Sequence, residues 1–145
     1  MKELLYLKDD QLIEFIEKIS MSYRETFSDA KKVLDRNSIG IAHHKVINLI
    51  SLYEGITISE LLKKLKITKQ SLNRVLKDLI SLDAIQFKKG EKDTRLKHVF
   101  LTKKGNQIFN EIFFAQKKRI YKALINSSSV EINSFNNVLK KIINE

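Results

Sequence analysis

The segment from residue 57 to residue 105 constrains the fold more than any other part of this chain of 145 residues. Thr57 and Glu60 have the spacing of a capping box, in which each side chain accepts a hydrogen bond from the backbone N–H of the other residue. A short helix is therefore expected over residues 58–65. Residues 66–67 make the turn that follows it.

A second helix is expected to begin after Thr68, a good N-cap residue, and to run to about Leu82. Apolar residues recur along it at helical spacing, which is the pattern of a helix with one buried face. They are Leu72, Val75, Leu76, Leu79 and Leu82.

The opposite face of this second helix is polar. Four polar residues follow one another along it at positions i, i+3, i+4 and i+7: Gln70, Asn73, Arg74 and Lys77. Lys69 extends this face at the N-terminal end of the helix. A polar face of this kind is the surface that a recognition helix offers to the major groove of DNA. The alternative is an ordinary solvated helix face.

Two short strands are expected after the helices. Residues 85–88 alternate apolar and polar side chains, as a half-buried strand does, and residues 98–101 supply the return strand. Between them, residues 89–95 carry one glycine and several charges, which suit an exposed hairpin tip. A basic hairpin placed directly after a helix, a turn and a helix makes a wing.

The wing carries a specific sequence pattern, D-x-R-x-x-x-V-x-L-T-x-x-G. Its members are Asp93, Arg95, Val99, Leu101, Thr102 and Gly105, with Thr94 at the second position. This pattern resembles the wing signature of the multiple-antibiotic-resistance regulator (MarR) family of bacterial transcription factors. The resemblance covers nearly the whole chain, with two departures: Asp83 stands where the family usually has glycine, and Ala42 where a capping Ser or Thr is common.

The resemblance implies a mostly α fold with a small antiparallel β-wing, that is, a winged helix-turn-helix with long N- and C-terminal dimerisation helices. The chain would be one domain, with dimerisation helices over about 1–36 and 106–145 and the DNA-binding part over about 41–105. Such a protein acts as a homodimer on double-stranded DNA, usually as a repressor. Aspartate tolerates the left-handed conformation, so the turn at Asp83 is expected to survive.

The candidate DNA-binding residues lie on the second helix and the wing: Thr68, Lys69, Gln70, Ser71, Asn73, Arg74, Lys77, Lys92 and Arg95. Gln70 and Asn73 can read adenine edges, and Arg74 can read guanine or bind phosphate. Arg95 suits the minor groove, where a narrow A·T tract concentrates negative potential. Asp93 is expected to orient a nearby arginine, because phosphates would repel its carboxylate.

Long helices are expected on both sides of this segment. The first begins at Asp9 or Asp10 and reaches about Asp35, the second covers about 41–53, and a third runs over about 102–126. The last helix follows a capping box at Ser128 and Glu131 and carries apolar residues almost to the end of the chain. A monomer would gain little from ordering such a tail, which favours a dimer that interleaves the terminal helices over a tail folded back on its own chain.

The charge is unevenly distributed. The net charge is +10, and residues 66–104 hold 11 Lys and Arg against 4 Asp and Glu, a net +7, whereas residues 1–36 hold 7 against 8, a net −1. Uniform lysine enrichment for solubility would not leave the first helix acidic. The distribution therefore favours a polyanion partner for the expected helix pair and wing.

Several other classes of protein are disfavoured by composition. The chain has no cysteine, which removes disulfides and thiolate metal sites. The sequence has no run of 18 apolar residues, so no transmembrane helix is expected. The N-terminus is too short and too charged for a signal peptide. We expect a cytoplasmic protein without a cofactor.

No catalytic constellation is predicted. The sequence lacks an H-E-x-x-H motif, a glycine-rich phosphate loop and a nucleophile elbow. His43 and His44 are adjacent, so on a helix they diverge by about 100°, and His98 lies on the return strand; these histidines are expected at the surface or in an interface. A metal site built from His44 and acidic residues is the alternative.

In the family, a cleft between the long helices and the winged part binds small aromatic or phenolic effectors. Residues here of types that could line such a cleft are Tyr23, Phe27, His43, His44 and Tyr53. They could equally be ordinary core and interface residues. The function hypotheses are therefore a homodimeric, sequence-specific regulator, or a winged-helix module for protein assembly or non-specific nucleic-acid binding without an effector.

Overall fold

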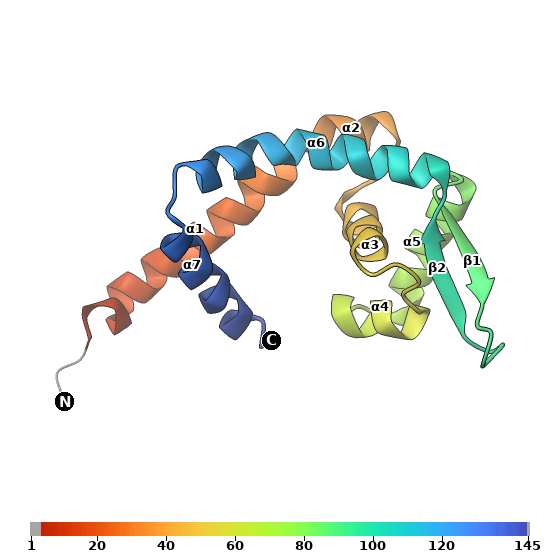
Figure 1. Cartoon of the computed structure of the whole chain (residues 1–145), viewed down its shortest axis with the longest axis horizontal. Coiled ribbons are helices and arrows are strands. Elements are labelled where there is room, and N and C mark those ends of the chain that lie inside the picture. Colours follow the sequence, from red (N-terminus) through yellow and green to blue (C-terminus); the bar gives the residue numbers. More distant parts are fainter. Residues whose placement is uncertain (1–3, 145) are drawn as a thin grey trace. The chain divides into compact units, whose positions relative to one another are not determined.

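The computed structural model describes residues 4–144, which form seven α-helices, one short 3-10 helix and two β-strands (Figure 1). The fold is mostly helical, as predicted. The described residues divide into two compact units, one built from residues 4–29 and 114–144 and the other from Ala30–Phe113.

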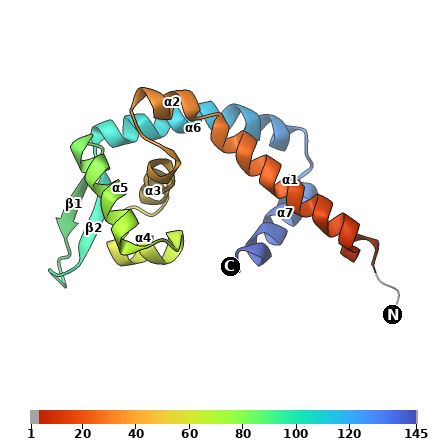
Figure 2. The same cartoon turned by 180° about the vertical axis from the view of Figure 1, so that it is seen from behind.

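The Ala30–Phe113 unit contains the segment with the strongest sequence signals. Its elements are α2 (Lys31–Arg36), α3 (Ile41–Leu52), α4 (Ile58–Leu65), α5 (Lys69–Ser81), β1 (Ile85–Lys89), β2 (Lys97–Leu101) and the first half of α6 (Lys103–Ile125). Seen from either side, α5 lies between α3 and the hairpin of β1 and β2 (Figures 1 and 2). Apart from α2, which was not predicted as a separate helix, the boundaries agree with the prediction to within one or two residues.

The core of this unit is apolar, and each of its helices and strands contributes at least one buried side chain to it. Fully buried side chains include Ile47, Ile50, Leu61, Leu72, Leu79, Val99 and Ile112. The buried residues of α5 are Leu72, Val75, Leu76 and Leu79. These are four of the five residues of its predicted apolar face, so the helix presents the predicted opposite face to solvent.

The two strands form an antiparallel hairpin. Ile85 pairs with Leu101 and Phe87 with Val99. The loop before α4 adds a third, short pairing, in which the N–H of Val99 donates to the carbonyl oxygen of Ile56 at 2.9 Å. The base of the hairpin is thereby fixed to the loop that leads into α4.

The turn at Asp83 survives without glycine. Asp83 has φ 59°, in the left-handed region, and its N–H donates to the carbonyl oxygen of Ile80 at 2.9 Å. Lys66, at the C-terminus of α4, has the same left-handed conformation, with φ 54° and ψ 42°. Both turns therefore use non-glycine residues in a conformation that is uncommon outside Asn, Asp and Gly.

The prediction of one continuous helix over residues 9–35 is wrong. The structure has α1 (Asp9–Ser28), an interruption at residues 29–30, and then α2. The apolar stripe is continuous in sequence, but its two halves have different surroundings. Ala30, Val33 and Leu34 are buried in the core of the Ala30–Phe113 unit, whereas no residue of α1 is buried. Neither proline nor glycine marks the break.

The other unit holds the 3-10 helix Leu5–Leu7, α1, the second half of α6 and α7 (Ser129–Ile142). The capping box at the start of α7 is confirmed, since Ser128 Oγ accepts from the N–H of Glu131 at 3.1 Å and Glu131 Oε1 accepts from the N–H of Ser128 at 3.1 Å. The backbone N–H of Ser128, and after it the Ser128 hydroxyl, stabilise the carboxylate and hold the pKa of Glu131 below its usual range.

Polar contacts join α1 to α6 in this unit. Arg119 Nε donates to Asp29 Oδ2 at 2.6 Å, and Arg119 Nη2 donates to Asp29 Oδ1 at 3.0 Å. Gln116 Nε2 donates to the carbonyl oxygen of Thr26 at 2.9 Å. The arginine holds the pKa of Asp29 below its usual range. Residues 90 positions apart in sequence therefore fix the end of α1.

Candidate nucleic-acid interface

The first helix of the interface, α4, is set by its caps. Thr57 Oγ1 accepts from the N–H of Glu60 at 3.2 Å, and Glu60 Oε2 accepts from the N–H of Thr57 at 3.1 Å. This is the predicted capping box. The left-handed Lys66 then ends α4 and turns the chain toward α5.

The second helix, α5, begins at the predicted cap. Thr68 Oγ1 accepts from the N–H of Ser71 at 3.1 Å, and the Thr68 hydroxyl also donates to Ser71 Oγ at 2.9 Å. Because the opposite face is buried against the core, all seven predicted residues of this helix region are exposed. They are Thr68, Lys69, Gln70, Ser71, Asn73, Arg74 and Lys77.

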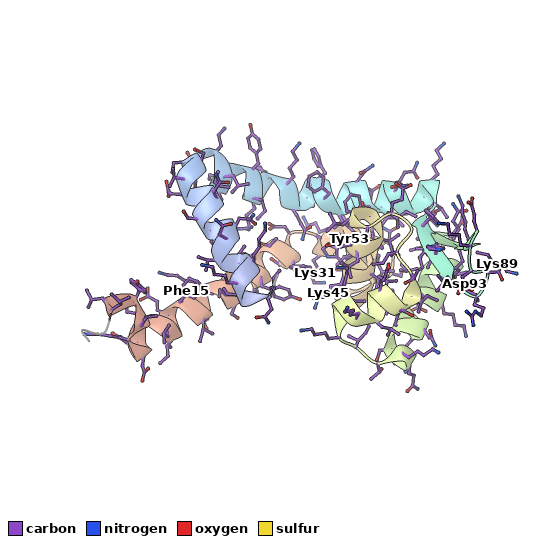
Figure 3. All side chains as sticks on the ribbon, turned by 60° about the horizontal axis from the view of Figure 1, so that its bottom comes forward. Phe15, Lys31, Lys45, Tyr53, Lys89 and Asp93 are labelled. Atoms are coloured by element: carbon purple, nitrogen blue, oxygen red, sulfur yellow. The ribbon has the colours of Figure 1, made fainter. Side chains whose placement is uncertain are left out.

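The wing tip is ordered by hydrogen bonds among its own residues. The N–H of Gly90 donates to the carbonyl oxygen of Leu96 at 2.9 Å, and the N–H of Leu96 donates to the carbonyl oxygen of Asp93 at 3.1 Å. Figure 3 shows Lys89 and Asp93 at this end of the hairpin. The predicted residue Lys92 is exposed in the same loop. The tip is therefore a structured turn.

Asp93 holds Arg95 by three hydrogen bonds. Asp93 Oδ1 accepts from the backbone N–H of Arg95 at 3.0 Å and from its Nε at 3.1 Å, and Asp93 Oδ2 accepts from Nη2 at 3.1 Å. The guanidinium, together with this backbone N–H, holds the pKa of Asp93 below its usual range. The Arg95 side chain remains 89% exposed. The pair therefore orients the arginine on the wing without burying it.

A hollow of about 280 Å³ brings the helix and the wing together. Its lining includes Lys69 and Asn73 from α5, Arg95 and Lys97 from the hairpin, and Ser59 from α4. Lys97 and Ser59 are not among the predicted DNA-binding residues. Ser59 lies in the first turn of the predicted α4 helix, whereas Lys97 lies just before the predicted return strand and belongs to β2 in the structure.

Two histidine contacts were also missed by sequence reasoning. His98 Nδ1 donates to the carbonyl oxygen of Gly55 at 2.8 Å, which ties β2 to the loop before α4. His43 Nε2 lies 2.9 Å from Asp78 Oδ2, which ties α3 to α5. The partners are 43 and 35 positions apart, so no local pattern signals either contact.

The residues expected to line an effector cleft are distributed over both units. Tyr23 and Phe27 lie on α1 with ring centroids 4.5 Å apart. In the other unit, Lys64 Nζ lies 4.2 Å from the ring centroid of Tyr53, and His43 is engaged by α5. The effector cleft stays a prediction.

The expectation that the adjacent histidines lie at the surface or in an interface is wrong for His44. This residue is 0% exposed. It shares the inward face of α3 with Ile47, because a residue three positions on returns to nearly the same side of a helix. Within residues 4–144, no cluster of three or more His, Asp or Glu side chains could hold a metal ion. None of the described helices is long and apolar enough to cross a membrane.

Comparison with known proteins gives the family. A family model described as MarR family matches residues 38–96. The chain is 36% identical over 140 residues to the HTH-type transcriptional regulator PetP of Rhodobacter capsulatus, in a match that covers 97% of this chain and 84% of that protein.

Solved structures share the fold. Staphylococcus aureus MarR in complex with salicylate and kanamycin has a TM-score of 0.72 at 22% identity, over 94% of this chain and 95% of that chain. A mutant MarR from E. coli complexed with operator DNA has a TM-score of 0.66 at 24% identity, over 97% of this chain and 99% of that chain.

The capped pair α4–α5, followed by a basic two-stranded hairpin, defines a winged helix-turn-helix protein of the DNA-binding class. Together with the near full-length match to PetP, this places the molecule among transcriptional regulators. The chain belongs to the MarR family.

Proposed function

We propose that this protein is a homodimeric, sequence-specific transcriptional regulator that acts as a repressor on a pseudo-palindromic operator. The observation that carries this proposal is the convergence of the exposed α5 face with the wing arginine, seen in the hollow lined by Lys69, Asn73 and Arg95. Major-groove reading by α5 would supply base recognition, and the wing would meet the adjacent minor groove.

The charge and the relatives support DNA as the partner. The net +7 of residues 66–104 lies on the helix-turn-helix and the wing. A related MarR from E. coli has been solved with operator DNA. No convergent catalytic set was predicted, and the related PetP is a transcriptional regulator. We therefore propose a regulator that acts in the cytoplasm without a cofactor, and not an enzyme.

Unburied apolar side chains support the homodimer. No residue of α1 or α7 is buried, although both helices carry apolar stripes. Phe15, Phe135 and Ile142 are all exposed, at 43%, 56% and 47%. Large apolar side chains left exposed on two helices favour an interaction site, and a second copy that interleaves the terminal helices would cover them.

Selection from a random DNA pool tests this proposal. Purified full-length protein would be used to recover bound duplexes at physiological salt. We expect a palindromic sequence whose half-sites lie about one helical turn, or 34 Å, apart. If only unrelated sequences are recovered, sequence-specific regulation is contradicted and the assembly or non-specific binding hypothesis takes its place.

We propose further that a small aromatic or phenolic effector releases the operator. Staphylococcus aureus MarR has been solved with salicylate and kanamycin. The candidate effector-binding residues here are Tyr23, Phe27, His43 and Tyr53, whereas His44 is buried in the core. A ligand shifts a conformational equilibrium only by its differential affinity for the two states. It would act by fixing a spacing between the two α5 helices that does not match the half-sites. A panel of phenolic acids that changes neither the melting temperature nor operator affinity would contradict a phenolic effector.

A further inference from the structure

His43 joins the start of α3 to the recognition helix α5. His43 Nδ1 accepts from the N–H of Gly40 at 3.1 Å. In a neutral imidazole, one nitrogen accepts and the other carries the hydrogen, so Nε2 donates to Asp78 Oδ2, which lies 2.9 Å away. The His43 side chain is only 17% exposed, whereas that of Asp78 is 54% exposed. The ring therefore has a defined tautomer and a defined partner.

Asp78 is the sole acidic residue in the sequence of α5, and it lies four positions after Arg74. Side chains four residues apart on a helix are neighbours, and an aspartate and an arginine at that spacing attract one another. None of the ion pairs formed within residues 4–144 involves Arg74. The carboxylate of Asp78 is instead turned to His43.

The direction of this carboxylate matters for DNA binding. A negative charge on the DNA-facing helix repels phosphates. An Asp78–Arg74 pair would also occupy the guanidinium donors that a bidentate contact to guanine needs, a contact that is not proposed for the wing arginine. We propose that His43 is a positioning residue for DNA recognition: it holds Asp78 toward α3 and so leaves Arg74 available to the operator. This inference rests on the proposed function.

The cap at the start of α3 shows which side chains could replace His43. Gly40 is the N-cap and has no side-chain oxygen, and His43 is the third residue of the helix. Glutamine at this position can accept a hydrogen bond from the N-cap N–H, as in a capping box, and its amide also carries a donor. His43→Gln therefore retains both contacts, whereas His43→Ala loses both.

A double-mutant cycle between His43 and Asp78 tests the proposal. The full-length wild type, His43→Ala, Asp78→Asn and the double variant would be compared for affinity to the selected operator and to random duplex, with His43→Gln as the matched control. We expect His43→Ala to weaken operator binding roughly tenfold, the range of one lost arginine–base contact. His43→Gln should stay within about threefold of the wild type.

The sign of the Asp78→Asn effect separates this role from a structural one. In the wild type, we expect that substitution to change operator affinity less than about threefold, but in the His43→Ala background it should restore roughly tenfold. A merely structural histidine would leave the double variant as weak as His43→Ala, and that result would overturn the inference. So would an equal effect of Asp78→Asn in both backgrounds.

Two controls keep the outcome decisive. If His43→Ala does not fold, His43→Met takes its place, because methionine fills the partly buried position and carries no donor for Asp78. If the wild type itself selects no operator, the proposed function fails. If it does select one and the cycle shows no coupling, the role of His43 alone fails.

Discussion

Gly105, in the first turn of α6, lies directly against the carbonyl oxygen of Ala84: a Cβ atom on Gly105 would stand 1.9 Å from that oxygen. Thr102 completes this contact, since its N–H donates to the Ala84 oxygen at 3.0 Å and its Oγ1 accepts from the N–H of Gly105 at 3.0 Å. The threonine and glycine of the L-T-x-x-G pattern therefore join α6 to the start of β1.

Gly105→Ala is expected to destabilise the protein. The added methyl group must push α6 away from Ala84, and forced overpacking of this kind costs about 1–3 kcal/mol. Urea denaturation followed by circular dichroism measures the change. Lys104→Ala is the matched control, because Lys104 is an exposed residue in the same helical turn. An equal loss in both variants would contradict the close-approach explanation.

Asp29 is expected to titrate below its usual range in the folded protein, because the Arg119 side chain stabilises its carboxylate. A folded-state pKa below the unfolded one adds stability at pH values above the ordinary aspartate pKa of about 4, and this stability is lost as the pH falls through the folded value. Arg119→Gln should raise the Asp29 midpoint in a carboxyl NMR titration.

The control for that titration is Arg36→Gln, since Arg36 pairs with Glu111 at 2.9 Å and not with Asp29. It should leave the Asp29 midpoint where it is. If the Asp29 titration midpoint does not change in Arg119→Gln, the ion pair does not persist in solution.

The terminal helices are expected to hold the dimer. Replacing Leu139 and Ile142 by aspartate would place charges in the proposed interface, at a cost of several kcal/mol, and sedimentation at micromolar concentration should show monomers. Asn136→Asp with Asn137→Asp adds the same charge to exposed positions of α7 and serves as the control. A truncation to residues 1–126 that stays a folded dimer would contradict interleaved termini.

Local signals made the α4–α5 pair and the hairpin predictable. Each cap lies within three residues of its partner, as at Thr57 and Glu60, and the alternation of β1 is visible in five residues. The interruption of the first helix was not predictable in this way, because Asp29 is held by Arg119, which is 90 positions away. The burial of His44 was not predicted, because a single polar residue on an apolar helix face gives no sequence signal that it is buried.

In the proposed DNA complex, the exposed face of α5 reads bases, while the wing binds DNA less selectively. Arg74 is exposed on the helix face, where a bidentate contact to guanine contributes about 1–3 kcal/mol of discrimination. Arg95 is held on the hairpin by Asp93. In the proposed complex it would enter the minor groove, which discriminates poorly between bases. Each arginine that meets a phosphate adds about one unit to the salt dependence of log affinity.

The most direct measurement compares Arg74→Ala and Arg95→Ala for binding to the selected operator and to random duplex over a range of salt concentrations. We expect Arg95→Ala to weaken binding to the operator and to random duplex alike, with a flatter salt dependence. We expect Arg74→Ala to weaken binding to the operator more than binding to random duplex. Equal losses on both DNAs for both variants would reduce Arg74 to a phosphate contact and leave base reading to Gln70 and Asn73. If neither variant loses affinity, α5 and the wing are not the DNA-binding surface, and the account is contradicted.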